Sequence, residues 1–430
     1  MKQQYPGSGL PESTNPAPAS VAAPYRIALV FGSFRGGGVA RAMLRTARGF
    51  LARGFAVDLV VGRAQGDLRD EIPEQAGIIE LERASKWRAR SQMLAADPGA
   101  FGQLLTVWNL SGKLRYLPSL VRYFREVRPN AVFAATAPFN LITVWPRRLV
   151  RLDARVVGSE HNQLALETVG QHRWRYDCPP SLLRHGYLQA DAIVAVSDGV
   201  ANELALHAGI PRSHLTTVYN PIVGPEMLLK AQSMVSHPWF EPGEPPVILG
   251  VGMLKPQKDF PTLIRAFARV RSERPVRLLI LGGLRKSAKD EAYRVDLESL
   301  VAQLGVTKDV CFAGFVTNPF AYMSRVALFV LSSAWEGLPS VLIEALACGC
   351  PVVSTNCPSG PAEILANGEF GPLMPVGDDA AMADAIKTIL DAPPNPRILQ
   401  QRAEMFSIDR AIDQYETLLF GRKITQSATQ

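Results

Sequence analysis

Short apolar runs alternate with amphipathic stretches through the first half of this 430-residue chain. Such runs predict buried strands, and the stretches between them predict helices with one apolar face. The expected strands are 27–31, 56–61, 131–135, 155–158, 190–197 and 215–221, and the clearest helices are 39–53 and 198–207. Strands that alternate with helices form parallel sheets. We therefore expect an α/β domain with a doubly wound parallel sheet at residues 25–223.

The second half repeats this alternation after a proline-rich, poorly periodic stretch at 222–246, which we interpret as a linker. The expected strands are 247–251, 276–281, 310–313, 326–331 and one from 352, and the expected helices are 260–270, 290–303, 341–347, 380–390 and 406–420. Residues 1–24 are rich in Pro, Ser and Ala and predict a disordered tail. The fold class is therefore α/β, with two doubly wound, Rossmann-like domains that face a cleft.

One polar corner stands out between the expected strand 326–331 and the helix after it. Glu336 lies in the turn, and Glu344 follows eight residues later, within the helix. In open parallel sheets, ligands bind where a strand passes into a helix. Backbone N–H groups at a helix start hold anions, and carboxylates accept hydroxyl groups. The corner predicts a ligand that carries both phosphate and sugar.

In each half of the chain, a glycine-containing loop follows the first strand. In the first loop, Gly36, Gly37 and Gly38 let a ligand approach the backbone closely. This loop is not G-x-G-x-x-G, and no acidic residue ends the next strand, so the pattern disfavours a dinucleotide site.

The loop of the second half begins at Gly252 and carries Lys255 and Lys258. A lysine at this place meets a phosphate as a point charge. Beside the Glu336 corner we favour phosphate for Lys258, with a solvated loop lysine as the alternative.

His161 follows the expected strand 155–158, within the sequence Ser-Glu-His-Asn. Side chains at the carboxyl end of a parallel strand face the ligand side of the sheet. We favour a functional role for His161 over that of a satisfied structural histidine.

Positive charge is concentrated in the first half, although the net charge of the whole chain is only +7. Residues 1–224 hold 26 Lys and Arg against 17 Asp and Glu, whereas the remainder holds 20 against 22. Residues 84–128 combine basic side chains with Trp, Tyr, Phe and Leu. This predicts either a surface that lies on an anionic membrane or an ordinary solvated helix face. No nucleic-acid recognition module appears, so nucleic acid is not an expected partner.

The five cysteines are odd in number and mostly lie in or beside expected core segments, which favours a reducing compartment without disulfides. Cys348 and Cys350 do not have the usual C-x-x-C metal spacing. No Asp-x-Asp motif follows a strand, so we expect no metal. No stretch of about 20 apolar residues predicts a membrane span. We expect a cytoplasmic protein, peripheral on the inner face of the cell membrane if the basic surface binds it.

The corner sequence W-E-G-L-P-S-V-L-I-E-A-L-A-C-G-C-P-V-V-S-T, followed by P-S-G-P-A-E, resembles the E-x₇-E signature of glycosyltransferase family 4. This is a large retaining family with the GT-B fold. Further stretches fit in the family's order: G-G-G-V-A-R, E-H-N, A-D-A-I-V-A-V-S, V-Y-N-P-I, P-Q-K-D-F-P-T-L-I-R-A-F-A and G-F-V-T-N-P. The resemblance covers residues 26–420.

The resemblance implies a role for each matching position. The N-terminal domain, 25–223, would bind the acceptor, the C-terminal domain, 224–405, would bind the nucleotide sugar, and the helix at 406–421 would return to the first domain. Glu344 would bind ribose hydroxyls and Glu336 donor-sugar hydroxyls, while Lys258 would neutralise the leaving diphosphate. The pyrophosphate or sugar would be bound by the backbone of Gly337, Leu338, Pro339 and Ser340. The backbone of Val316 would contact the base, and His161 would lie near the transferred sugar or the acceptor.

One departure from the family pattern concerns the phosphate loop, where Met253 follows Gly252 in place of the usual arginine. A methionine cannot pair with phosphate. Our hypothesis is that Lys255 supplies this charge.

We expect a retaining hexosyltransferase that moves a sugar from a nucleotide-sugar donor of the UDP or GDP type. The expected acceptor is lipid-linked or a polysaccharide, in the synthesis of a cell-surface glycan such as lipopolysaccharide. No cofactor is expected. The alternatives are a non-catalytic sugar-nucleotide binder, which Met253 keeps open, and a nucleotide-sugar epimerase on the same fold. A phosphorylase would need a pyridoxal-phosphate lysine, of which there is no sign.

Overall fold

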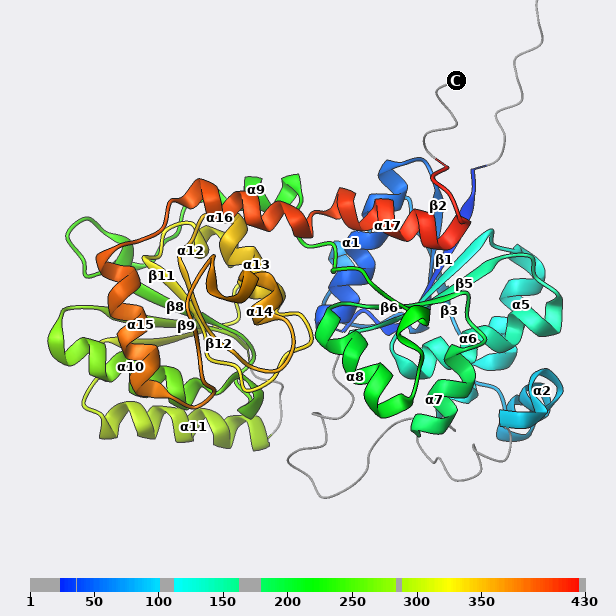
Figure 1. The fold of residues 1–430 in the computed structure, drawn as a ribbon, viewed down its shortest axis with the longest axis horizontal. Coiled ribbons are helices and arrows are strands. Elements are labelled where there is room, and N and C mark those ends of the chain that lie inside the picture. The colour runs from blue at the N-terminus through cyan, green and yellow to red at the C-terminus, as the bar shows by residue number, and fades with distance from the viewer. Residues whose placement is uncertain (1–23, 36, 101–111, 162–178, 284–287, 425–430) are drawn as a thin grey trace, which may run out of the picture.

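The computed structural model describes residues 24–35, 37–100, 112–161, 179–283 and 288–424. Within these ranges, the strands form two separate sheets (Figure 1). One has the order β3-β2-β1-β4-β5-β6-β7 and the other β10-β9-β8-β11-β12-β13. Neighbouring strands within each sheet are parallel. The predicted pair of doubly wound α/β domains is confirmed.

In the N-terminal domain, β1 lies inside the sheet, between β2 and β4. Ile27, Leu29 and Phe31 pack in one apolar cluster, whereas Ala28 and Val30 pack in another. Both faces of the sheet are therefore buried, as expected for a parallel sheet with helices on each side. The elements are β1 (Arg26–Ser33), α1 (Gly38–Ala52), β2 (Ala56–Arg63), β3 (Gly77–Glu80), α2 (Lys86–Ala96), α5 (Leu117–Val127), β4 (Ala131–Ala135), α6 (Ala137–Val150), β5 (Arg155–Glu160), α7 (Pro180–Tyr187), β6 (Ala192–Ala195), α8 (Asp198–Ala208) and β7 (Leu215–Thr217).

The C-terminal domain has the same architecture. The stretch expected as a linker carries a short helix, α9, which packs against α12. The elements are α9 (Pro225–Ala231), β8 (Val247–Val251), α10 (Phe260–Glu273), β9 (Arg277–Leu281), α11 (Ala288–Gln303), β10 (Val310–Gly314), α12 (Phe320–Met323), β11 (Leu328–Leu331), α13 (Ser340–Ala347), β12 (Val352–Thr355), α14 (Pro361–Ile364), β13 (Leu373–Met374), α15 (Asp379–Asp391), α16 (Pro396–Ala403) and α17 (Ile408–Phe420).

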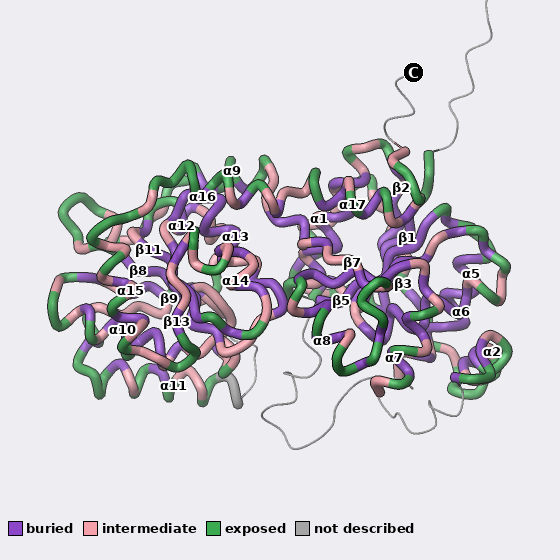
Figure 2. Tube along the Cα trace, viewed as in Figure 1, coloured by how far each residue is buried: buried purple, intermediate pink, exposed green. Residues whose placement is uncertain are grey.

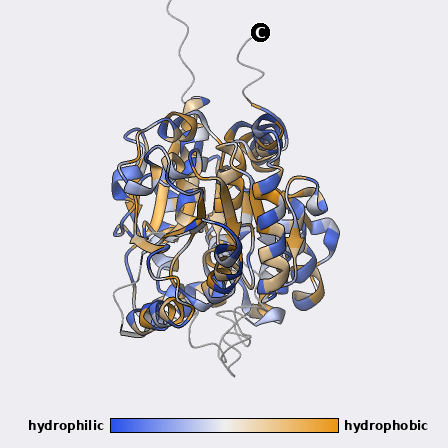
Figure 3. Ribbon diagram, turned by 90° about the vertical axis from the view of Figure 1, so that its left-hand side faces the viewer, coloured by the Kyte–Doolittle hydropathy of each residue, from blue (hydrophilic) through white to orange (hydrophobic). Residues whose placement is uncertain are grey.

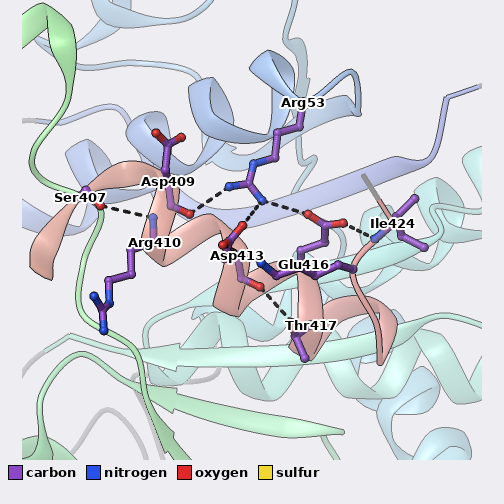
Figure 4. A network of polar contacts seen from close by, with 9 residues as sticks. Arg53, Ser407, Asp409, Arg410, Asp413, Glu416, Thr417 and Ile424 are labelled. Atoms are coloured by element: carbon purple, nitrogen blue, oxygen red, sulfur yellow. Dashed lines mark hydrogen bonds and ion pairs between the residues drawn. The ribbon is translucent and has the colours of Figure 1, made fainter. Parts of the chain in front are cut away.

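The last helix, α17, leaves the C-terminal domain and packs on α1, β4 and β5 of the first (Figure 1). Ile412 and Tyr415 are buried there in the cluster that also contains Phe50. Arg53, at the end of α1, binds three groups of this helix (Figure 4): the Asp409 carbonyl at 3.0 Å, the Asp413 carboxylate at 2.7 Å and the Glu416 carboxylate at 3.0 Å. Apolar burial and a charged network therefore both fix α17 to the N-terminal domain.

The chain passes between the domains twice, and the two passages lie side by side. Val223 and Ser407 form an isolated parallel bridge. The N–H groups of Ile222 and Val223 donate to the Phe406 carbonyl, and the Ile408 N–H donates to the Val223 carbonyl. The two domains are therefore joined by a hydrogen-bonded pair of segments.

Burial follows the sheets in both domains (Figure 2), and apolar residues are concentrated in the strands (Figure 3). Helices at the surface present a polar face outward, as amphipathic helices do. No helix within the described residues has the length and apolar character needed to cross a membrane.

Candidate functional site

The predicted polar corner lies where β11 passes into α13. The strand residues of β11 are fully buried, and Pro339 precedes the first helical residue, Ser340. The corner is tied to the loop after β8: the Ala334 N–H donates to the Gln257 carbonyl at 2.8 Å, and the Gln257 side-chain amide donates to the Trp335 carbonyl at 2.7 Å. Two segments almost 80 residues apart in sequence therefore form one site.

Lys258 and Glu336, the two predicted charged residues, lie in direct contact. Lys258 Nζ is 2.6 Å from Glu336 Oε1, and the two side chains are 14% and 11% exposed. The Ser333 hydroxyl donates to the same carboxylate oxygen at 2.7 Å. The lysine chain lies across Gly252, where a β-carbon would come within 2.9 Å of Lys258 Cε. A cation and an anion are thus held at one point at the carboxyl edge of the sheet.

Backbone donors stand next to this pair. Within the described part of the chain, the N–H groups of Gly337, Leu338 and Ser340 have no hydrogen-bond acceptor. Ser340 is the first residue of α13, where the helix dipole places partial positive charge. This row of donors beside a lysine suits phosphate oxygens or sugar hydroxyls.

Glu344 lies one turn further along α13 and is only 6% exposed. Its Oε1 accepts a hydrogen bond from Arg45 Nη2 at 2.9 Å, and Arg45 belongs to α1 of the other domain. The structure therefore pairs the second carboxylate of the motif with a cation across the domain boundary. The sequence analysis did not single out Arg45.

A second contact between the domains joins the start of α8 to α14. The Glu363 carboxylate accepts the N–H groups of Asp198 and Gly199 at 2.8 and 2.9 Å. Glu363 therefore caps the first turn of a helix that belongs to the opposite domain. Burial is the main cause that raises the pKa of Glu363, and these two N–H groups oppose it.

His161 follows directly after β5, as predicted, and is 7% exposed. The Ser159 hydroxyl donates to the Ala134 carbonyl at 2.9 Å and lies 3.1 Å from His161 Nε2. Because that hydroxyl proton is used, Nε2 carries the ring proton and donates to Ser159. Nδ1 is then a bare acceptor, buried and without a partner among the described residues. Burial lowers the pKa of His161 to about 4, so the ring is neutral at pH 7.

The other predicted positions are placed as follows. Lys255 has an extended backbone and opens the 3₁₀ turn that carries Lys258. Val316 is half-buried just after β10 and packs against the core. Gly37 and Gly38 are exposed at the start of α1, whereas Gly36 lies outside the described residues.

Potential metal-binding groups form no cluster within the described residues. Over the residues that the structure describes, no three His, Cys, Asp or Glu side chains lie close enough to hold a metal ion. Cys348 and Cys350 are free, and burial raises the pKa of the Cys348 thiol to about 12. This thiol is therefore protonated at pH 7.

Two family models together match most of the chain. The Glycosyltransferase Family 4 model matches residues 36–223, and the model of Glycosyl transferases group 1 matches residues 235–406. The chain belongs to the family 4, group 1 glycosyltransferases. The family resemblance of the motifs is therefore confirmed.

Two curated relatives match part of this glycosyltransferase. An N-acetylgalactosamine-N,N'-diacetylbacillosaminyl-diphospho-undecaprenol 4-alpha-N-acetylgalactosaminyltransferase of Campylobacter jejuni is 34% identical over 205 residues, which are 48% of this chain and 52% of that protein. The lipopolysaccharide core biosynthesis glycosyltransferase LpsE of Rhizobium meliloti is 34% identical over 186 residues, 42% of this chain and 52% of that protein. The matched regions thus span about half the length of these relatives.

Solved glycosyltransferases share the fold over nearly the full length. The crystal structure of Anabaena Alr3699/HepE in complex with UDP has a TM-score of 0.68 and 19% identity to this chain. The superposition covers 92% of this chain and 99% of the other. The predicted GT-B fold is confirmed.

Proposed function

We propose that this glycosyltransferase is a retaining hexosyltransferase that moves a sugar from a nucleotide-sugar donor to a lipid-linked or polysaccharide acceptor. The observation that carries the proposal is the donor row of Gly337, Leu338 and Ser340 beside the Lys258–Glu336 pair. This corner offers N–H groups and a cation for phosphate, and a carboxylate for sugar hydroxyls.

The reaction breaks the bond between the anomeric carbon and a diphosphate oxygen. Positive charge develops on the sugar and negative charge on the leaving diphosphate, so fixed cations and N–H dipoles lower the barrier most. A diphosphate at the α13 N-terminus would draw the Lys258 ammonium toward it. The Glu336 carboxylate would then be released to accept donor-sugar hydroxyls.

His161 would act as a hydrogen-bond acceptor rather than as a cation. Its neutral ring presents Nδ1, while Nε2 is engaged by Ser159. A hydroxyl of the transferred sugar or the acceptor suits this lone pair. In this role the ring positions the sugar and leaves the charge stabilisation to Lys258.

The nucleotide would lie along α13 and the end of β10. Glu344 would take the ribose hydroxyls with Arg45 holding its other side, and the backbone of Val316 would contact the base. Lys255 would supply the charge that Met253 lacks. We propose a donor of the UDP or GDP type, and the UDP in the HepE structure supports the former. The cation of Lys258, the N–H groups at the start of α13 and the absence of an Asp-x-Asp motif from the sequence support a reaction without metal or other cofactor.

The names of the relatives support the acceptor class. One is named for a diphospho-undecaprenol acceptor and the other for lipopolysaccharide core biosynthesis. An acceptor with a lipid anchor would bring the enzyme to the cytoplasmic face of a membrane. Helix α2 supports such a contact, because Trp87 is 81% exposed between the exposed basic residues Lys86 and Arg88.

A thermal-shift screen of the full chain against UDP, GDP, ADP and their nucleotide sugars tests the proposal. A ligand that binds only the folded state raises the melting temperature. We expect one diphosphate and its sugar conjugates to raise it, with no change on adding EDTA. Transfer from the preferred donor, followed by NMR of the anomeric proton, then tests retention. Binding without transfer to any acceptor would favour the non-catalytic binder, and release of a free epimer would favour the epimerase.

A further inference from the structure

The donor loop of the C-terminal domain is touched by a side chain of the N-terminal domain at one backbone oxygen. The Ser197 hydroxyl lies 2.9 Å from the Gly337 carbonyl oxygen, and the Ser359 hydroxyl lies 2.8 Å from the same atom. The two hydroxyl oxygens are 2.7 Å apart. Gly337 follows Glu336 and opens the row of unpaired N–H groups, so this contact falls within the proposed donor site.

Proton counting shows that the Gly337 carbonyl always receives a hydrogen bond here. The two hydroxyls hold two protons, and the Ser197 oxygen also accepts the Val200 N–H at 3.2 Å. If both hydroxyls donate to the carbonyl, it receives two bonds. If one hydroxyl donates to the other, the second still donates to the carbonyl. Each serine can therefore hold the carbonyl when the other is removed.

Holding this carbonyl also aims the next N–H group. The peptide bond is planar and trans, so the Gly337 C=O and the Leu338 N–H point in opposite directions. With the carbonyl bound to the two serines, the Leu338 N–H must face the other side of the loop. That N–H has no acceptor within the described part of the chain. It is therefore presented to a ligand in one direction.

Further contacts fix the start of α8 against this loop. The Glu363 carboxylate binds the N–H groups of Asp198 and Gly199, directly after Ser197. A β-carbon on Gly199 would come within 2.8 Å of Ser359 Cβ and 2.9 Å of its Cα. Ser359 itself has φ +68, an uncommon conformation for a residue with a side chain. The start of α8 and the turn at Ser359 are thus closely packed.

We propose that Ser197 is a positioning residue for the donor, which acts through the Gly337–Leu338 peptide. Its hydroxyl, with that of Ser359, turns the Leu338 N–H toward a diphosphate or sugar oxygen of the nucleotide sugar. Because Ser197 belongs to the N-terminal domain, the Gly337 carbonyl has its second hydroxyl partner only when the domains are in contact. The inference rests on the proposed function and adds a residue from the acceptor-side domain to donor binding.

The test is a double-mutant cycle with Ser197→Ala, Ser359→Ala and the combined variant, all in the full chain. Isothermal titration measures the affinity for the nucleoside diphosphate that the wild type binds best among UDP, GDP and ADP, and for the matching nucleoside. Each single variant keeps one hydroxyl on the carbonyl, so we expect losses of no more than about threefold in diphosphate affinity. The double variant leaves the carbonyl without a donor, and we expect a loss of about tenfold or more, in excess of the product of the two single effects. Nucleoside affinity should stay unchanged, because the nucleoside lacks the phosphates.

Two controls separate positioning from folding. Ser197 caps α8, so Ser197→Ala also weakens that helix, whereas Ser197→Thr keeps both the cap and the donor and should restore diphosphate affinity. Ser324→Ala removes a similar bond, from a serine hydroxyl to the Ala231 carbonyl at 2.8 Å, away from the corner, and should leave affinity unchanged.

The outcomes separate this inference from the proposed function. If the double variant binds the diphosphate as tightly as the wild type, or loses nucleoside affinity in parallel, the positioning role of Ser197 is overturned. The proposed function is not affected by either result. A wild type that binds none of the three diphosphates overturns the proposed function and this assignment together.

Discussion

Arg45 Nη2 lies 2.9 Å from Glu344 Oε1, which joins the first helix of the N-terminal domain to the motif helix of the C-terminal domain. The two side chains are only 15% and 7% exposed. The carboxylate assigned to the ribose is therefore also part of the domain contact. In the proposed function, nucleotide binding and domain contact therefore depend on the same side chain.

Replacing Arg45 tests this pair. Arg45→Met leaves the Glu344 charge buried without its partner, which should lower the free energy of unfolding by about 2–4 kcal/mol. Arg45→Met combined with Glu344→Gln should recover part of this loss, because the unpaired charge is gone. Urea titrations of the wild type, both single variants and the double variant measure the coupling. Strictly additive effects would contradict a direct interaction.

Lys258→Met should reduce the turnover of the transferase by about 10²–10³-fold, because it removes a fixed cation from the leaving diphosphate. Lys308→Met changes an exposed lysine of the same domain and serves as the matched control. Steady-state kinetics with the preferred donor measure both variants. A Lys258→Met enzyme with normal turnover would exclude the assigned role.

Lys255→Ala tests the hypothesis that Lys255 compensates for Met253. We expect turnover to fall by about tenfold or more. This loss is smaller than that expected for Lys258→Met, because Lys255 lies at the start of the turn. Met253→Arg should then restore activity to Lys255→Ala, since arginine at that position is the usual phosphate partner in the family. Unchanged turnover in Lys255→Ala would reject the hypothesis.

The buried His161 predicts an acid-dependent loss of stability. Its pKa is lowered from 6.5 to about 4 in the folded protein by burial, so the unfolded state binds more protons between these values. Stability from this group is therefore complete above pH 6.5 and falls as the pH is lowered toward 4. At pH 5 the loss is about 2 kcal/mol.

His161→Phe should remove this component, because phenylalanine does not titrate. The measurement is the free energy of unfolding in urea at pH 7.5 and pH 5.0 for the wild type and the variant. We expect the wild type to lose about 2 kcal/mol more than the variant between the two values. Equal losses would show that the ring is protonated as readily in the folded state as in the unfolded one.

Trp87→Ala tests the proposed membrane contact of α2. The exposed indole would enter the headgroup region beside Lys86 and Arg88, so its removal should weaken binding to vesicles with 30% anionic lipid, about tenfold. Leu206→Ala, at an apolar side chain that is 79% exposed on α8, is the matched control. Co-sedimentation at low and high salt measures both. Equal binding by Trp87→Ala and the wild type would favour an ordinary solvated helix face.

The sequence predicted the sheets well because buried parallel strands are short, continuous apolar runs. The strands at 131–135 and 247–251 were predicted with their observed bounds. In contrast, α6 was missed, since it carries Pro146 and every residue from Ala137 to Pro146 is buried, so polar positions do not mark its outer face. The edge strand β3 was also missed, because Ile78 and Ile79 are its only apolar residues and none of its four residues is buried.

The local part of the candidate site could be predicted from its motif, but the contacts between domains could not. The corner at Glu336 and the strand-end His161 follow from single segments of sequence. Arg45 and Glu344 are 299 residues apart, and Ser197 and Gly337 are 140 apart. Such pairs depend on how the two domains pack, and no pattern within one segment encodes that packing.

The return of α17 to the first domain has a consequence for the order in which the protein folds. The ribosome makes residues 1–223 first, yet the apolar surface around Phe50 is covered by Ile412 and Tyr415, near the end of the chain. At a synthesis rate of about 5–20 residues per second, the missing helix emerges roughly 10–40 s later. During that interval the nascent N-terminal domain lacks the helix that covers this apolar face, and a chaperone that binds exposed apolar surface would protect it.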